Sequence, residues 1–205
     1  MLLFPPLSIA IMQRISLLNM AHNAIKEHVK LNDIVIDATL GNGHDTLFLT
    51  QQVGPLGLVF GFDIQQSAIE STIERIKIHS HLDCLRLFHT SHENMTDKIP
   101  QQFHGKISAI MFNLGYLPGG DKSIITASES TLNTLNTACS LISDRGIITV
   151  LAYPGHKGGD VETTNIKTWC EQLNKNHFHI EIITSTVANE TAPMLFVIRK
   201  QTNTN

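Results

Sequence analysis

The sequence has 205 residues, 42% hydrophobic and 16% charged, a balance that excludes wholesale disorder and fits one globular domain. A net charge of −3 excludes a strongly basic protein, so a nucleic-acid substrate would need a local basic patch. The cysteines at 84, 139 and 170 are too scattered for a metal site or a disulfide framework and indicate reduced thiols in a cytosolic protein.

The chain divides into an extension at residues 1–14, one domain at 15–200 and a tail at 201–205. The first twelve residues are apolar, but they lack a basic start and contain Pro5 and Pro6. They also fall short of the ~20 residues that a membrane-spanning helix needs. We therefore expect no export signal and no membrane contact.

Hydrophobic periodicity predicts alternating helices and strands in the first half of the chain. Residues 15–29 have apolar positions three or four apart, which is typical of an amphipathic helix, whereas residues 33–38 are a short β-branched run. The same criteria predict helices at 45–53 and 65–79 and strands at 57–63, 84–89 and 107–112.

The second half continues with a Gly- and Pro-rich loop at 115–123, and then with further helices and strands. Helices are expected at 131–142 and 160–174, and strands at 146–152, 179–187 and 195–199. No helix separates the last two strands, so they should be antiparallel. The sequence thus predicts a doubly wound, mostly parallel, seven-stranded α/β sheet with an antiparallel terminal strand.

Ligands of such sheets bind at the carboxyl ends of the strands. The first strand leads into a turn rich in glycine and polar residues: Asp37, Gly41, Asn42, Gly43, His44 and Asp45. Glycines let the backbone turn sharply and approach a ligand closely. The second strand ends at Asp63, 20 residues after Gly43, which suits a carboxylate that binds ribose hydroxyls.

The charges in this turn favour S-adenosylmethionine over a nicotinamide dinucleotide. The third glycine of the dinucleotide motif is Thr46 here, and Asp45 would repel a pyrophosphate. Asp37 instead suits the ammonium group of a methionine moiety. Structural alternatives remain: Asp45 as a helix cap, Asp63 as a turn residue, and His92, which with Ser91 would border an adenine, as a loop residue.

The fourth strand leads into an acceptor loop that begins Asn113-Leu-Gly-Tyr116. It resembles the Asn-Pro-Pro-Tyr loop of nitrogen methyltransferases, although Leu114 and Gly115 replace the prolines. We expect Asn113 to position a target amine through an acceptor oxygen. Tyr116 would pack against the base or the sulfonium, unless it only anchors the loop.

The fifth strand is followed by Tyr153, Pro154, Gly155, His156 and Lys157. Tyr153 and Lys157 are candidates for stacking on a base and meeting phosphate, and His156 could take the amine proton. The alternative is a simple turn before the next helix.

Segments 34–46, 60–65, 112–122 and 153–156, taken in this order, closely resemble the rRNA methylase family. The resemblance implies a Rossmann-like class I methyltransferase fold and S-adenosylmethionine as cofactor. Characterised members methylate the aminomethyl group of the wobble thiouridine in certain tRNAs. It therefore implies a cytoplasmic, often dimeric enzyme that binds the anticodon loop of tRNA.

By the same resemblance, matching residues surround the cofactor, namely Asn42, His44, Asp63, Gln65, Ser91 and His92. Three alternatives stay open at this point. The acceptor could be rRNA or another amine, the chain could be a nicotinamide-dependent oxidoreductase, or it could be a silent nucleotide-binding module.

Overall fold

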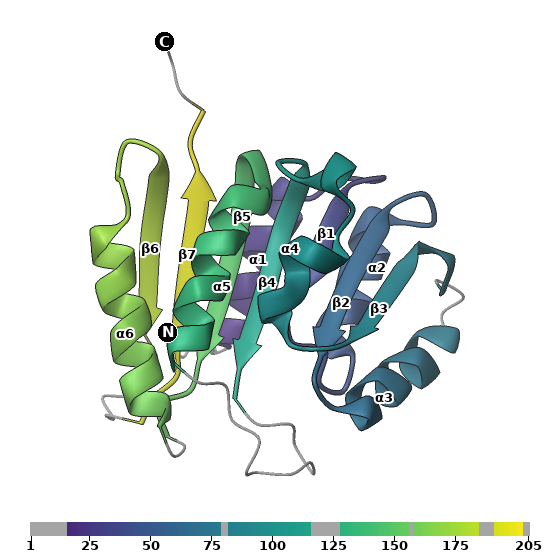
Figure 1. Ribbon diagram of the computed structural model, residues 1–205, viewed down its shortest axis with the longest axis horizontal. Helices are drawn as coiled ribbons and strands as arrows, with labels where there is room; N and C mark the ends of the chain where they lie inside the picture. The colour runs from purple at the N-terminus through teal and green to yellow at the C-terminus, as the bar shows by residue number, and fades with distance from the viewer. Residues whose placement is uncertain (1–15, 79–81, 116–127, 156–157, 185–190, 203–205) are drawn as a thin grey trace, which may run out of the picture.

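The computed structural model describes residues 16–78, 82–115, 128–155, 158–184 and 191–202. Within them a single sheet of seven strands has helices on both faces (Figure 1). The strands are β1 (Ile34–Asp37), β2 (Leu58–Asp63), β3 (Leu85–His89), β4 (Ile107–Leu114), β5 (Ile142–Ala152), β6 (Phe178–Thr184) and β7 (Met194–Lys200). The α-helices are α1 (Leu17–His28), α2 (His44–Val53), α3 (Gln66–Lys77), α4 (Met95–Lys98), α5 (Ser128–Leu141) and α6 (Gly159–Gln172).

The strand order is β3-β2-β1-β4-β5-β7-β6. All neighbours from β3 to β5 are parallel, and β7 runs antiparallel between β5 and β6. This confirms the predicted fold. Strand order reverses between β1 and β4, and such a switch point is where ligands of doubly wound sheets bind.

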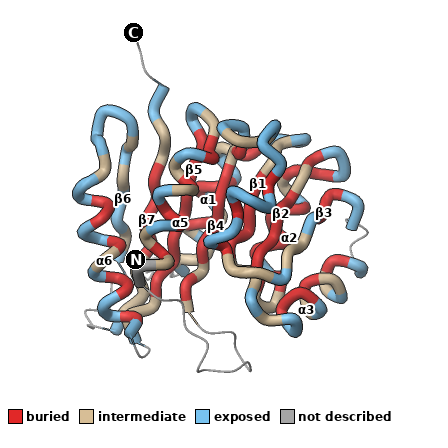
Figure 2. The backbone as a smooth tube through the Cα atoms, viewed as in Figure 1, coloured by how far each residue is buried: buried red, intermediate tan, exposed pale blue. Residues whose placement is uncertain are grey.

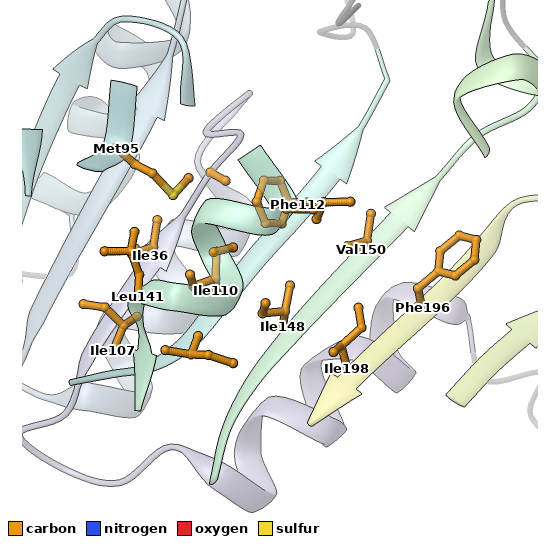
Figure 3. Packing of buried hydrophobic residues seen from close by; sticks show 14 of the residues in the cluster. Ile36, Met95, Ile107, Ile110, Phe112, Leu141, Ile148, Val150, Phe196 and Ile198 are labelled. Atoms are coloured by element: carbon orange, nitrogen blue, oxygen red, sulfur yellow. The ribbon is translucent and has the colours of Figure 1, made fainter. Parts of the chain in front are cut away.

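The two faces of the sheet carry separate apolar cores because alternate strand residues point to opposite sides. On β4, Ala109 and Met111 pack with residues of α1, α2 and α3, whereas Ile110 and Phe112 pack with residues of α4, α5 and α6. The central strands are therefore buried on both sides (Figure 2), and Figure 3 shows the second core at close range. By this alternation, Asn113 belongs to the face of α1 and α2.

The predicted boundaries needed two corrections on the central strands. Strand β4 runs two residues beyond the predicted end, so Asn113 lies within it, paired with Leu151. The helix predicted to reach Ile142 ends at Leu141, and Ile142 begins β5. Arg145 has φ 69°, and a β-carbon on Gly146 would lie 2.8 Å from that of Ile142, so β5 has an irregular start and begins four residues before the predicted strand.

Short helical segments at Leu82–Cys84, His92–Asn94, Met95–Lys98 and Gln101–Phe103 were not predicted, since three or four residues carry too little periodicity. The three cysteines are free thiols. No helix in the described part of the chain is both long and apolar enough to cross a membrane.

Candidate active site

The carboxyl end of β1 is fixed by the buried carboxylate of Asp37. It accepts hydrogen bonds from the Thr46 hydroxyl at 2.6 Å and the Thr39 amide at 3.1 Å. Burial, and then the negative charge of Asp45, raise the pKa of Asp37 to about 7. Asp37 thus links the end of β1 to the turn and to the first turn of α2 by hydrogen bonds. Its direct contact with a methionine ammonium stays a prediction.

The glycine turn carries the chain from β1 into α2. Gly41 and Gly43 have φ of 52° and 75°, a backbone conformation that residues other than glycine rarely adopt. A β-carbon on Gly43 would lie 2.8 Å from the Thr72 α-carbon, so the turn packs tightly against α3. The Arg75 Nε also donates to the Asn42 carbonyl at 2.6 Å.

Helix α2 begins at His44, which is exposed, and its N-cap residue is Gly43. The alternative interpretation of Asp45 as the helix cap is therefore wrong. The first-turn carboxylate of Asp45 is instead engaged by side chains outside the helix.

Asp63 brings the end of β2 against the glycine turn, and its predicted contact with a ribose stays a prediction. One carboxylate oxygen accepts from the Gly41 amide at 3.0 Å, and the other accepts from the Gln65 amide at 2.9 Å. The side chain is only partly buried, and each carboxylate oxygen has a further lone pair. Ribose hydroxyls are suitable donors for those positions. Next to it the Ile64 side chain is 48% exposed.

Ser91 and His92 lie where the chain leaves β3. The Ser91 hydroxyl accepts from the Glu93 amide at 3.3 Å, and the His92 ring packs edge-on against Phe112, with 5.8 Å between ring centres. Burial lowers the pKa of His92, which favours a neutral imidazole. Its buried Nε2 has no hydrogen-bond partner among the described residues, which is costly unless a ligand supplies one. This feature, with the Asp63 turn, fits an adenosine-type cofactor.

Asn113 is held in place at two points at the end of β4. Its backbone amide donates to the Thr39 hydroxyl at 2.7 Å, and its side-chain Nδ2 donates to Asp45 Oδ2 at 3.2 Å. An ionised carboxylate only accepts hydrogen bonds, so the amide nitrogen must face Asp45. The Oδ1 atom is then the one not engaged by Asp45, and its predicted contact with a target amine stays a prediction.

His22 on α1 completes this cluster and was missed by the sequence analysis. Its Nε2 lies 2.7 Å from Asp45 Oδ1, and its ring stacks on Phe48 with 3.9 Å between ring centres. The Asp45 carboxylate therefore contacts His22 and Asn113, and its predicted contact with the cofactor stays a prediction. His22 precedes the glycine turn by a whole strand, so no local motif could have revealed it.

Tyr153, after β5, lies beside the start of the acceptor loop. A β-carbon on Gly115 would lie 3.6 Å from the Tyr153 ring. Burial, and then the charge of Asp45, raise the pKa of the Tyr153 phenol, so it stays protonated at neutral pH. Tyr116, His156 and Lys157 lie outside the described residues. Among the described residues, no three His, Cys, Asp or Glu side chains are grouped as metal ligands.

Solved structures with the same fold identify the class of protein. A "putative rRNA-methylase" from Clostridium thermocellum has a TM-score of 0.85 and 37% identity, over 95% of this chain and 100% of that one. A "putative methyltransferase" from Streptococcus mutans, solved in complex with SAH, has a TM-score of 0.80 and 27% identity, over 90% and 98% of the two chains. The fold is that of a class I S-adenosylmethionine-dependent methyltransferase.

More specifically, the chain belongs to the "Putative rRNA methylase" family, whose model matches residues 59–199. A "tRNA (mnm(5)s(2)U34)-methyltransferase, chloroplastic" from Arabidopsis thaliana is 39% identical over 150 residues, which is 69% of this chain and 54% of the relative. A "Ribosomal RNA small subunit methyltransferase H" from Halothermothrix orenii is 40% identical over 90 residues, 42% of this chain and 27% of the relative. The matched stretches thus span about half or less of these curated relatives. The predicted family and cofactor are confirmed.

Proposed function

We propose that this chain methylates the aminomethyl nitrogen of wobble 5-aminomethyl-2-thiouridine in tRNA, using S-adenosylmethionine. The observation that carries the proposal is the orientation of Asn113, whose amide nitrogen is held by Asp45 and whose oxygen is left to accept from an amine. The Arabidopsis relative, named for this wobble nucleotide, supports the choice of substrate.

The residues of the cofactor half would hold the methyl donor. When bound, S-adenosylmethionine supplies an electrophilic methyl group on a sulfonium. Asp63, which the Gly41 amide holds in place, would accept hydrogen bonds from its ribose, and the His92 Nε2 would bond to its adenine. These contacts would hold the donor at the switch point of the sheet, where ligands of doubly wound sheets bind.

Asn113 would contribute by orienting the amine. Methyl transfer is an in-line displacement, so the rate depends on holding the nitrogen lone pair in line with the reacting bond. A neutral amide oxygen can accept a hydrogen bond from an N–H group of an uncharged amine. A carboxylate at the same position would favour the unreactive ammonium form, because an opposite charge stabilises the charged state.

The anticodon loop is a favourable substrate because its wobble base is already unpaired. Turning a base out of a helix costs a few kcal/mol, and an unpaired base avoids most of that cost. We propose that the Tyr153 ring stacks against the nucleotide, that Tyr116 and Lys157 add the contacts predicted from the sequence, and that His156 takes the proton that the methylated amine releases. A cytoplasmic homodimer belongs to the same proposal.

The test uses tRNA from cells that lack the terminal wobble methylation. The protein is incubated with this tRNA and S-adenosylmethionine, and the digested nucleosides are analysed by mass spectrometry. We expect a gain of one methyl group on aminomethyl-thiouridine, lost with Asn113→Ala. Transfer to ribosomal RNA alone, or to no RNA, would reject the tRNA assignment.

A further inference from the structure

We propose that His22 is a positioning residue for methyl transfer, acting through Asp45 to fix the orientation of the Asn113 side chain. The inference rests on the proposed role of Asn113 as the residue that binds the amine. It also adds helix α1 to the active site, although the family match begins only at residue 59.

The geometry places Asp45 between two donors. His22 Nε2 lies 2.7 Å from one carboxylate oxygen, and Asn113 Nδ2 lies 3.2 Å from the other. Asp45 is 5% exposed, so water can replace a lost donor only poorly. Both donors are therefore needed to hold the carboxylate in one orientation.

His22 is itself oriented by apolar packing. Its ring lies almost parallel to that of Phe48, with an angle of 4° between the planes. Its neighbours on α1, Ala21 and Ile25, are buried in the core beneath. The direction of the Nε2–H bond is thus set by the packing of α1 on the sheet, before any substrate binds.

Losing the bond from His22 would affect Asn113 in a specific way. The terminal torsion of an asparagine side chain is broad and nearly two-fold, so only hydrogen bonds decide which atom points to the substrate. Once Asp45 is free to rotate, the Asn113 amide can turn over and present its nitrogen instead of its oxygen. An amine cannot be held through its N–H by that nitrogen.

Two substitutions separate the hydrogen bond from the packing. His22→Phe keeps a ring to stack on Phe48 but has no donor, whereas His22→Gln keeps a donor but has no ring. His28→Ala is the matched control, because His28 lies on the same helix and contacts the Ala24 carbonyl rather than Asp45. We expect kcat to fall about tenfold in His22→Phe. We expect it to stay within about threefold of wild type in His22→Gln and His28→Ala, with unchanged affinity for S-adenosylhomocysteine.

A second measurement tests the orientation without any substrate. In ¹⁵N NMR spectra of the whole protein, the Asn113 side-chain amide is assigned by its absence in Asn113→Ala. Its resonances should move in His22→Phe and stay near the wild-type position in His22→Gln and His28→Ala. If the wild-type protein fails to methylate tRNA, the proposed function fails, yet this NMR result still tests the positioning. An Asn113 amide unmoved in His22→Phe, or full kcat in that variant, would overturn the inference.

Discussion

The two halves of the proposed active site are built in different ways. In the cofactor half, the Asp63 carboxylate is held by the backbone amides of Gly41 and Gln65, which belong to the turns after β1 and β2. In the acceptor half, Asn113 is held by side chains, and the chain of contacts runs through Asp45 to His22 on α1. Backbone contacts follow from turn conformation, whereas side-chain contacts depend on individual residues. We expect substitutions in the cofactor half to change the affinity for S-adenosylmethionine, and substitutions in the acceptor half to change turnover.

The largest effect on binding is expected from Asp63→Asn. The asparagine side chain has only one acceptor oxygen, so it cannot accept from the Gly41 amide, the Gln65 amide and the ribose together. Each hydrogen bond to a charged acceptor contributes about 1.5–3 kcal/mol. We expect the Kd for S-adenosylmethionine, measured by calorimetry, to rise about 30- to 100-fold. Turnover at saturating cofactor should change little. Glu70→Gln, on the exposed side of α3, is the control, and an equal loss there would remove the specific role of Asp63.

A smaller effect is expected from Asp37 on stability. Its pKa is raised to about 7, so between about pH 4 and 7 the folded protein binds a proton that the unfolded chain has released. This group therefore lowers the free energy of unfolding as pH rises through that window, and the penalty is complete above pH 7.

Asp37→Asn mimics the protonated acid and should abolish this dependence. We expect urea unfolding to show that, from pH 5 to pH 8, the free energy of unfolding of the variant rises relative to that of the wild type by on the order of 1–3 kcal/mol. The exposed Asp97→Asn provides the comparison and should track the wild-type protein. A constant difference between Asp37→Asn and wild type across this range would contradict the raised pKa.

The smallest effect is expected from Tyr153→Phe. Its phenol pKa is raised by burial, so the hydroxyl neither gains nor loses a proton near neutral pH. The ring, which lies beside Gly115, should account for most of its contribution. We expect kcat/KM for tRNA to fall no more than about threefold, while Tyr153→Ala falls further. An inverted order of the two variants would show that the hydroxyl matters more than the ring.

The same contrast explains what the sequence could predict. The glycine turn and Asp63 are close along the chain to the strands that end there, so periodicity and spacing were sufficient to find them. The sheet followed from alternating patterns, and β7 was correctly expected to be antiparallel. Boundaries failed where a strand is irregular, as at Ile142 in β5.

Sequence patterns could not show how the acceptor half is assembled. His22 occupies an ordinary position on an amphipathic helix, and nothing in that pattern indicates a bond to Asp45. Thr39 likewise looked like part of the glycine turn, although its hydroxyl accepts the Asn113 amide. These contacts join residues far apart in the chain, so only the packing of α1 and β4 around β1 brings them together.

The division between the two halves is tested most directly by titrating S-adenosylhomocysteine into Asn113→Ala. We predict a Kd within about twofold of wild type, because the cofactor contacts lie on the other side of the switch point, together with a loss of turnover of about 100-fold or more. A Kd that weakens as much as turnover falls would contradict the account, because Asn113 would then serve the cofactor rather than the amine.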